Sequence, residues 1–323
     1  MSRAVLVAAI ALATAIACTG APPPAAPAGI GNSAAYLLAN SSGIIGLDAS
    51  CRPLGPVVKL PDQSFAATIA LHPDRRSLVF TLTKAPDART GFGSDIYRAE
   101  LDGTGLRPVI EHEAENVFYA NPKYDPTGNV LYVHRRAALT ASGQYQGTED
   151  SIERIDLRSG KRERILRDAA DHILSPDGRT LVFVKLANGQ IQNLWTANAD
   201  GSDARPFFRT KDTFWYIQSP RFSPDGAQVA FSAAGHSASH GAAGGRLAHL
   251  GVPSELYVAA PDGSGLRSIG QTGDDVVPAW SPSADRIAYV GTGGFFIVDV
   301  AKQETQTCAQ GQDFFFGDLI WVR

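Results

Sequence analysis

Three histidines in one short stretch are the residues of this chain best suited to chemistry. His236, His240 and His249 fall within residues 233–253, a segment rich in Gly and Ala, and the whole chain of 323 residues has seven histidines. Imidazole nitrogens bind Zn²⁺ and related metals, and the spacing of His236 and His240 suits a shared metal where the chain is helical. The segment is therefore either a divalent-metal site or a polar loop without metal, and its glycines favour the loop.

A metal at these histidines would support an enzymatic alternative. This would be a metal-assisted lyase or hydrolase of a polysaccharide, with Glu149 or Asp150 as its acid. Against it, the sequence contains no Gly-x-Ser-x-Gly elbow, no His-Glu-x-x-His motif, no Walker loop and no paired-cysteine zinc site. We therefore expect a protein without a catalytic site or cofactor that works by binding.

Five stretches of the chain share one pattern that must position any such residues. Each has an extended segment, a turn of the Ser-Pro-Asp-Gly kind and a short apolar run, and the turn prolines are Pro73, Pro126, Pro176, Pro224 and Pro282. Pro, Asp and Gly all favour turn geometry, so we expect the turn acids to bind backbone. The intervals of 48 to 58 residues are typical of propeller blades and not of helical solenoids.

A second turn of the Asp-Gly kind follows in most repeats, at Asp102-Gly103, Asp200-Gly201 and Asp262-Gly263. It separates a third extended segment from a fourth. Four short antiparallel strands per repeat would form one blade, with both faces buried against neighbouring blades.

The repeats resemble those of the PD40, or TolB-type, subfamily of WD40-like β-propellers over most of residues 64–308. The shared hallmark is an aromatic residue, Ser-Pro-Asp-Gly and an apolar run, followed one turn later by Asp-Gly-Ser-Gly. Two repeats depart from it, at Asp125-Pro126-Thr127-Gly128 and at Ser281-Pro282-Ser283-Ala284. The resemblance implies the fold but no particular activity. TolB itself has an α/β domain before its propeller, so we do not expect a direct role in the Tol system.

The two ends of the chain supply one further repeat. Residues 314–321 look like the first strand of a blade, and residues 35–39, 43–48 and 56–58 look like the other three. Such closure would pair edges that otherwise stay open. The predicted fold is therefore all-β, with residues 34–323 forming a six-bladed β-propeller of four-stranded antiparallel blades, the last closed by both termini.

The N-terminus is predicted to direct export. Residues 1–17 contain an apolar run, residues 4–17, that is too short to cross a membrane, which is typical of a signal peptide. Ala15-Ile16-Ala17-Cys18 resembles a bacterial lipobox, so Cys18 is predicted to be lipidated; cleavage after Ala17 with a free thiol at Cys18 is the alternative. Residues 18–33, with four prolines, would then be a stiff tether. We expect a cell-envelope lipoprotein held on a membrane by its lipid anchor.

The other two cysteines are predicted to pair. Cys51 and Cys308 fall near outer-strand positions of adjacent repeats. A disulfide there would close a very long loop and, on the chain-entropy model, stabilise the fold by roughly 5 kcal/mol. Two unpaired surface thiols are the alternative.

Charge and loop length limit the class of partner. The net charge is −3 and no dense cluster of Lys and Arg occurs, which argues against nucleic acid. We expect a monomer that binds a protein, a peptide or a cell-envelope polymer.

Long loops at residues 84–94, 137–150 and 233–253 each join a second strand to a third. Such loops emerge on the same face as the connections between blades, so this face is the predicted binding face. Its more recognisable side chains would be Arg89, Phe92, Gln144, Tyr145 and His240. Tolerated insertions without a function are the alternative.

Overall fold

The protein is described by a computed structural model that covers residues 29–40, 43–208, 214–235, 254–311, 314 and 317–323. Within these residues the chain is all-β apart from the short helix α1 (Ile30–Ser33). No helix in the described part is long and apolar enough to cross a membrane. The predicted signal peptide, Cys18 and the three clustered histidines lie outside the described residues.

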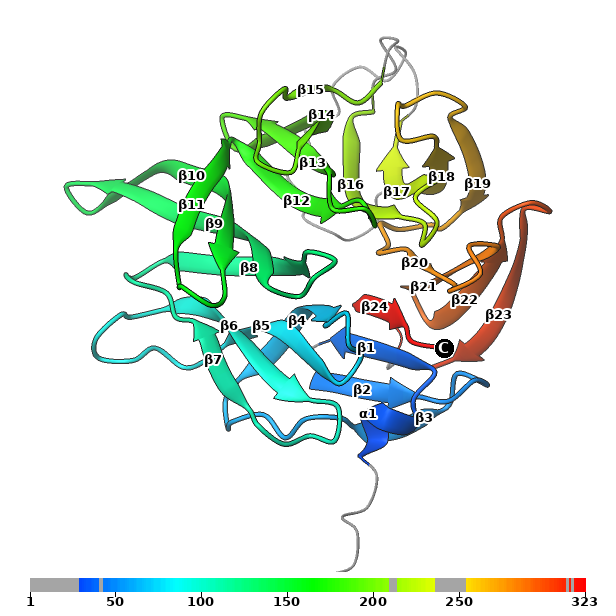
Figure 1. Ribbon diagram of the computed structural model, residues 1–323, viewed down its shortest axis with the longest axis horizontal. Helices are drawn as coiled ribbons and strands as arrows, with labels where there is room; N and C mark the ends of the chain where they lie inside the picture. The colour runs from blue at the N-terminus through cyan, green and yellow to red at the C-terminus, as the bar shows by residue number, and fades with distance from the viewer. Residues whose placement is uncertain (1–28, 41–42, 209–213, 236–253, 312–313, 315–316) are drawn as a thin grey trace, which may run out of the picture.

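The strands follow one another as four-stranded meanders around a centre (Figure 1). Those of the first half are β1 (Tyr36–Asn40), β2 (Gly43–Leu47), β3 (Pro53–Pro56), β4 (Phe65–Leu71), β5 (Ser77–Thr83), β6 (Gly93–Glu100), β7 (Arg107–Ile110), β8 (Val117–Tyr124), β9 (Val130–Ala141), β10 (Gln144–Asp156) and β11 (Arg162–Arg167). Those of the second half are β12 (Ala169–Leu174), β13 (Thr180–Ala187), β14 (Gln190–Asn198), β15 (Arg205–Pro206), β16 (Tyr216–Phe222), β17 (Val229–Ala234), β18 (Glu255–Ala259), β19 (Arg267–Gln271), β20 (Ala279–Trp280), β21 (Arg286–Gly291), β22 (Gly294–Asp299), β23 (Glu304–Gln310) and β24 (Asp318–Trp321).

Hydrogen bonding divides these described strands into four sheets of four strands and one of eight. The large sheet combines β4–β7 with β8–β11, because β6 and β8 pair in parallel at Gly93–Val117 and Ser94–Phe118. The prediction of six separate blades therefore differs from the hydrogen-bonded sheets at this point. The short connection 111–116 brings the start of β8 directly beside the start of β6, close enough for a two-residue ladder.

One sheet contains strands from both ends of the described chain. The order is β24-β1-β2-β3, and Tyr36 of β1 lies opposite Trp321 of β24 (Figure 1, blue and red). A disulfide between Cys51, just after β2, and Cys308 of β23 ties this sheet to the preceding one, with 5.9 Å between the Cα atoms.

The repeated turns are built from backbone-directed hydrogen bonds. In the turn after β16, the Ser223 hydroxyl donates to Asp225 Oδ1 at 2.6 Å, and the same carboxyl oxygen accepts the Ala227 N–H at 3.0 Å. Gly226 has a φ of 73°, a conformation in which a side chain would be strained. The Ser223 bond also lowers the pKa of Asp225. The turn acid is therefore engaged within its own turn, as its motif predicted.

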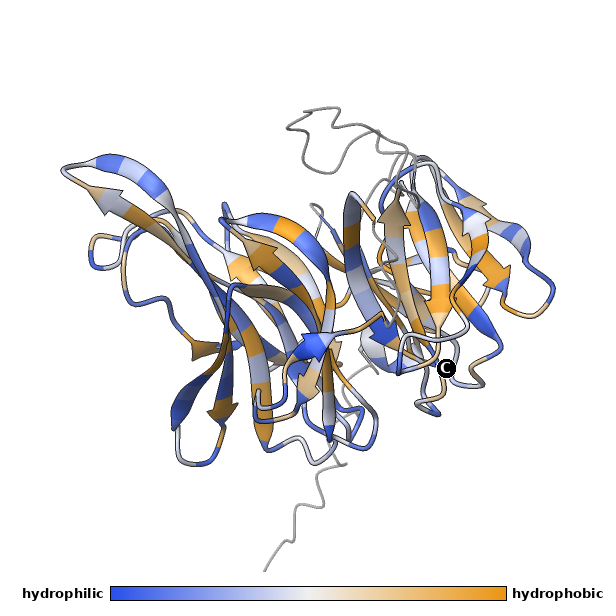
Figure 2. Cartoon of the chain, turned by 90° about the horizontal axis from the view of Figure 1, so that it is seen from above, coloured by the Kyte–Doolittle hydropathy of each residue, from blue (hydrophilic) through white to orange (hydrophobic). Residues whose placement is uncertain are grey.

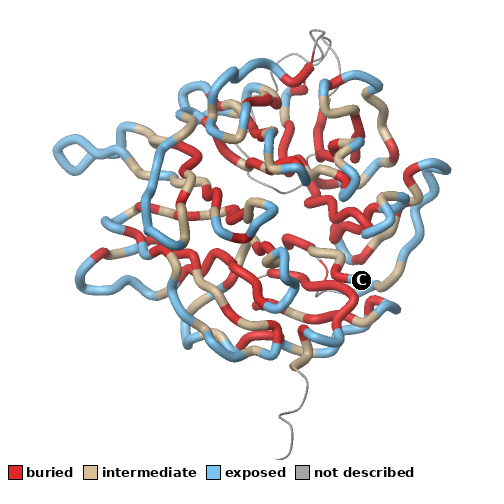
Figure 3. The backbone as a smooth tube through the Cα atoms, viewed as in Figure 1, coloured by how far each residue is buried: buried red, intermediate tan, exposed pale blue. Residues whose placement is uncertain are grey.

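The cores lie between neighbouring sheets. Alternate side chains of a strand point to its two sheet faces. Hydrophobic residues recur along the strands (Figure 2), and the strand residues nearest the centre of the ring are mostly buried (Figure 3). Between the sheets of β12–β15 and β16–β19, for example, the rings of Phe208, Phe214 and Phe231 pack with centroids less than 6 Å apart. Burial on both faces makes each sheet depend on its neighbours.

Candidate functional site

The first strand of each sheet unit faces the centre of the ring. These inner strands are β4, β8, β12, β16, β20 and β24 (Figure 1). Four of them contain an irregularity in register just before their last residues, at Ala66–Ile69, Ala120–Lys123, Ala170–Ile173 and Gln218–Arg221. A bulge of this kind changes the direction of the side chains at this point of the strand.

Polar residues recur at one position of these strands, three residues before the last residue. We call this set the channel ring; its members are Thr68, Asn121, Asp171, Ser219, Val277 and Asp318. Asn121, Asp171 and Ser219 have φ values of 51°, 43° and 55°, which the bulge imposes. Five of the six members are polar.

The ring members bond to one another across the sheets. The Asn121 N–H donates to Thr68 Oγ1 at 2.7 Å, and Asn121 Nδ2 donates to Asp171 Oδ1 at 3.1 Å. The Ser219 N–H in turn donates to Asp171 Oδ2. These bonds link β4, β8, β12 and β16 directly, so the ring fixes the inner strands relative to one another.

Two cations, the buried Lys123 and the largely buried Arg221, lie two residues beyond the channel ring. Arg221 Nη2 donates to Asp318 Oδ1 at 3.2 Å, and Lys123 Nζ lies 3.8 Å from Asp318 Oδ2. The Ile69 N–H donates to Asp318 Oδ2 at 2.9 Å. Burial alone would raise the pKa of Asp318, but Lys123 and Arg221 hold it below its ordinary value. Burial, together with repulsion from Arg221, lowers the pKa of Lys123 to about 8.

A cavity of about 250 Å³ adjoins these charges. We call it the channel pocket. Lys123, Arg221 and Asp318 line it together with apolar residues from the last part of the inner strands, chiefly Ile173, Phe222, Trp280, Leu319 and Trp321. Pro224 of a Ser-Pro-Asp-Gly turn also lines it, which places the pocket at the turn end of the channel.

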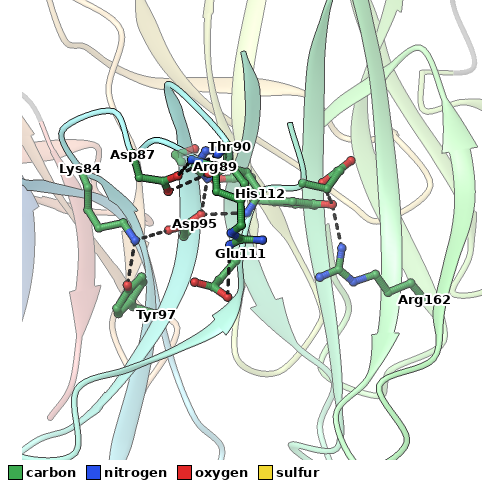
Figure 4. Close-up of polar contacts among 12 residues, drawn as sticks. Lys84, Asp87, Arg89, Thr90, Asp95, Tyr97, Glu111, His112 and Arg162 are labelled. Carbon is green, nitrogen blue, oxygen red and sulfur yellow. Dashed lines mark hydrogen bonds and ion pairs between the residues drawn. The ribbon is translucent and has the colours of Figure 1, made fainter. Parts of the chain in front are cut away.

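The predicted binding residues lie at the opposite end of the strands, which we call the loop face. Arg89 and Phe92 occupy the loop between β5 and β6, whose turn is held by Asp87 bonding to Arg89 N–H and to Thr90 (Figure 4). Arg89 Nη2 lies 4.0 Å from Glu111 Oε2. Phe92 is 39% exposed and its ring packs edge-on against Phe118 at 5.5 Å.

Gln144 and Tyr145 lie at the tip of the β9–β10 hairpin, which extends beyond the ring (Figures 1 and 3). Both are exposed, and Tyr145 is 66% exposed. Among the described residues, no hydrogen bond or ion pair joins this tip to Arg89 or Phe92. The structure thus places these predicted residues in two neighbouring loops, and His240 lies outside the described residues.

Most of the exposed large apolar side chains lie at the loop-face end of the strands. The described residues contain six exposed large hydrophobic side chains, which are Leu54, Phe65, Phe92, Leu139, Tyr145 and Trp215. All but Leu54 lie where an inner strand begins or where a second strand meets a third. Trp215 covers Gly235, where an added Cβ would fall 1.8 Å from the indole ring. Phe65, Leu139 and Trp215 were not among the predicted residues, although an aromatic residue at the start of an inner strand is visible in the repeats.

A buried carboxylate anchors the base of the β5–β6 loop (Figure 4). Asp95 Oδ2 lies 2.8 Å from Lys84 Nζ, and Asp95 Oδ1 lies 2.6 Å from His112 Nδ1. Burial alone would raise the pKa of Asp95, but Lys84 and His112 lower it overall. Lys84 Nζ also donates to the Tyr97 hydroxyl at 3.0 Å. This set holds the loop in place.

The two acids of the enzymatic alternative are held by cations. Asp150 Oδ1 accepts from His134 Nε2 at 2.8 Å and from Arg136 Nε at 2.7 Å. Glu149 Oε1 lies 2.9 Å from Arg164 Nη2. The described residues contain no group of three or more His, Cys, Asp or Glu residues that could hold a metal ion. The predicted ligands His236, His240 and His249 lie outside those residues.

Comparison with solved structures identifies the architecture. TolB from Acinetobacter baumannii matches with a TM-score of 0.61 and 15% identity over 89% of this chain, which spans 65% of that protein. The fold is that of a TolB-type β-propeller. A chain of a nidogen/laminin complex matches with a TM-score of 0.62 and 11% identity over 88% of this chain and 97% of that one.

An enzyme shares the architecture as well. Oligogalacturonate lyase from Vibrio parahaemolyticus matches with a TM-score of 0.53 and 10% identity over 83% of this chain and 71% of that one. No protein-family model and no curated protein matches the sequence. At these identities the likeness concerns the fold alone.

Proposed function

We propose that this protein is a non-enzymatic binding scaffold that holds a protein or peptide at its loop face. The observation that carries the proposal is that five of the six exposed large hydrophobic side chains of the described residues lie at the loop-face end of the strands. Exposed apolar residues grouped on one face are typical of interaction sites. The nidogen/laminin chain supports it, since that propeller occurs in a complex between proteins. An envelope polymer remains the other partner class for the same face.

The ring is proposed to have six blades, the last closed by both termini. The eight-stranded sheet counts as two blades, because β4–β7 and β8–β11 each form a meander with its own inner strand. The ladder between β1 and β24 and the Cys51–Cys308 disulfide support the closure. A disulfide also suits an exported protein, because the cytosol keeps thiols reduced.

Export and attachment through a lipid on Cys18 complete the proposal. Gly29, the first described residue, packs against the backbone of Asp102 in the turn between β6 and β7. This turn lies at the opposite end of the strands from the loop face. A tether that starts here would leave the loop face directed away from the membrane, where a partner can reach it.

Site-directed photo-crosslinking in the native envelope tests the loop face. A benzoylphenylalanine placed at Tyr145 or at Trp215 is expected to cross-link one defined partner. Leu54 offers a matched control, because it is 40% exposed but lies at the other end of the strands. Equal cross-linking from position 54, or none from the other two, would contradict the proposal.

The alternative is a metal-assisted polysaccharide lyase or hydrolase, supported by the shared architecture with oligogalacturonate lyase. It depends on His236, His240 and His249 binding a divalent metal. Titration of the mature protein with Zn²⁺ by calorimetry separates the two functions. Stoichiometric Zn²⁺ binding that is lost when His236, His240 and His249 are all replaced by alanine would favour the enzyme.

A further inference from the structure

The channel pocket presents hydrogen-bond donors to its interior more than acceptors. Asp318 already accepts from the Ile69 N–H on one oxygen and from Arg221 on the other. Among the described residues, Lys123 makes one hydrogen bond, to the Ile69 carbonyl at 3.2 Å. An ammonium group has three donors, so donor capacity of Lys123 remains directed toward the cavity it lines.

Arg221 likewise has more hydrogen-bond donors than it has acceptors around it. Its guanidinium carries five donors, and its hydrogen bonds within the described residues go to the Pro220 carbonyl and to Asp318. The nearest other carboxylate, Asp171 Oδ1, lies 3.9 Å from Nη1. An acceptor that entered the pocket would therefore find two cations with spare N–H groups.

The remaining walls are apolar and aromatic. Phe222, Trp280 and Trp321, the last residues of three inner strands, line the pocket with Ile173 and Leu319. Trp280 Nε1 donates to the Arg221 carbonyl at 3.0 Å, which satisfies the polar edge of that indole within the protein. The walls thus suit an apolar body, while the two cations suit an acid group.

We propose that the channel pocket binds a small organic carboxylate with an apolar body, its acid group on Lys123 and Arg221 and its body against Trp280 and Trp321. The site lies at the end of the channel opposite the loop face and is independent of the partner proposed there. Charge-assisted hydrogen bonds in a buried site are strong and directional, so they would select an acid over its neutral analogue.

Calorimetry with matched probes tests this inference on the intact mature protein. Phenylacetate is expected to bind at least about tenfold more tightly than phenylacetamide, which lacks the charge, and than acetate, which lacks the apolar body. Equal affinity for acid and amide, equal affinity for phenylacetate and acetate, or no binding of phenylacetate at millimolar concentration would overturn the proposal.

Two variants locate the site. Lys123→Met replaces the ammonium group by an unbranched apolar side chain one atom shorter and should weaken phenylacetate binding about tenfold or more. Arg221→Met removes the other proposed contact of the acid group and should also weaken phenylacetate binding about tenfold or more. Lys185→Met is the matched control, because Lys185 lies on β13 and does not line the pocket. Unchanged binding in Lys123→Met with normal thermal unfolding would overturn the proposal.

Proton uptake gives a readout that a purely structural lysine would not produce. The pKa of Lys123 is about 8, and the charged groups around it are Arg221, Asp318 and Asp171, while the neighbouring His172 is kept neutral by burial, which lowers its pKa to about 3. A bound carboxylate raises the pKa of Lys123, so binding at about pH 8 should take up protons. Calorimetry in buffers of different ionisation enthalpy should show this uptake in the native protein and lose it in Lys123→Met. Uptake that persists in the variant would overturn the assignment to Lys123.

Discussion

The loop face and the channel pocket lie at opposite ends of the same strands and are built in different ways. The loop face is formed by insertions such as the β9–β10 hairpin, and its apolar side chains are exposed. The pocket is formed by equivalent positions of the repeats, and its charged side chains are at most 12% exposed. A substitution in an insertion changes a surface, whereas one in the channel acts on several sheets at once. Substitutions at the loop face should therefore mainly affect partner binding, whereas substitutions around the channel pocket should mainly affect stability.

The largest effect is expected from removing the central carboxylate. Asp318→Ala leaves Lys123 and Arg221 buried without their shared counter-ion, which should lower the free energy of unfolding by about 3–5 kcal/mol. Urea denaturation measures this change. Asp62→Ala is the control, since Asp62 is exposed and is not among the residues with a positive φ, and it should cost at most about 0.5 kcal/mol. Similar losses in both variants would contradict the separation.

Removing the disulfide should have the next largest effect. The paired substitution Cys51→Ser with Cys308→Ser frees the sheet that contains β1 and β24 from its neighbour and should cost about 2–5 kcal/mol. Thermal unfolding with and without reductant checks it. If reduction leaves the midpoint unchanged, the disulfide does not stabilise the ring.

Acid should weaken the base of the β9–β10 hairpin. Burial alone would raise the pKa of Asp150, but hydrogen bonds from His134 and Arg136 lower it from 3.8 to about 2. Because the folded-state pKa is the lower one, this stabilisation is complete above pH 3.8 and is lost as the pH falls through about 2. Asp150→Asn should cost about 1–2 kcal/mol at neutral pH and flatten this acid dependence. An unchanged acid profile of unfolding in the variant would contradict it.

The smallest effect on stability is expected at the hairpin tip. Tyr145→Ala removes a largely exposed ring and should change the free energy of unfolding by no more than about 0.5 kcal/mol. Partner binding at the loop face should nevertheless weaken. A loss of stability comparable to that of Asp318→Ala would remove the distinction between the two ends.

Much of the fold could be predicted from the repeats. The turn motif places Asp225 in its own turn, and the strands on either side follow from it. The parallel pairing of β6 and β8 was not predicted, because it consists of two residue pairs and leaves no periodic pattern in the sequence. It depends on the position of the connection 111–116. The loop lengths indicated the loop face, but Trp215 was missed because it follows a connection between repeats and not an insertion.

The channel charges show the limit of sequence reasoning. Aligning the inner strands by their last residues would have placed Lys123 and Arg221 at one repeat position and Asp318 two residues earlier. It would not have shown that Arg221 reaches Asp318, 97 residues away in sequence. That contact depends on how the inner strands meet around the axis.

By itself the sequence determined the all-β class, the length of the repeats and the turns, because these depend on residues close together in the chain. Only the tertiary structure decided that Lys123, Arg221 and Asp318 share one buried cluster and that the exposed aromatic residues lie on one face. The physical reason is that local backbone preferences act over a few residues, whereas buried charges interact through space, and their partners are set by the arrangement of whole sheets.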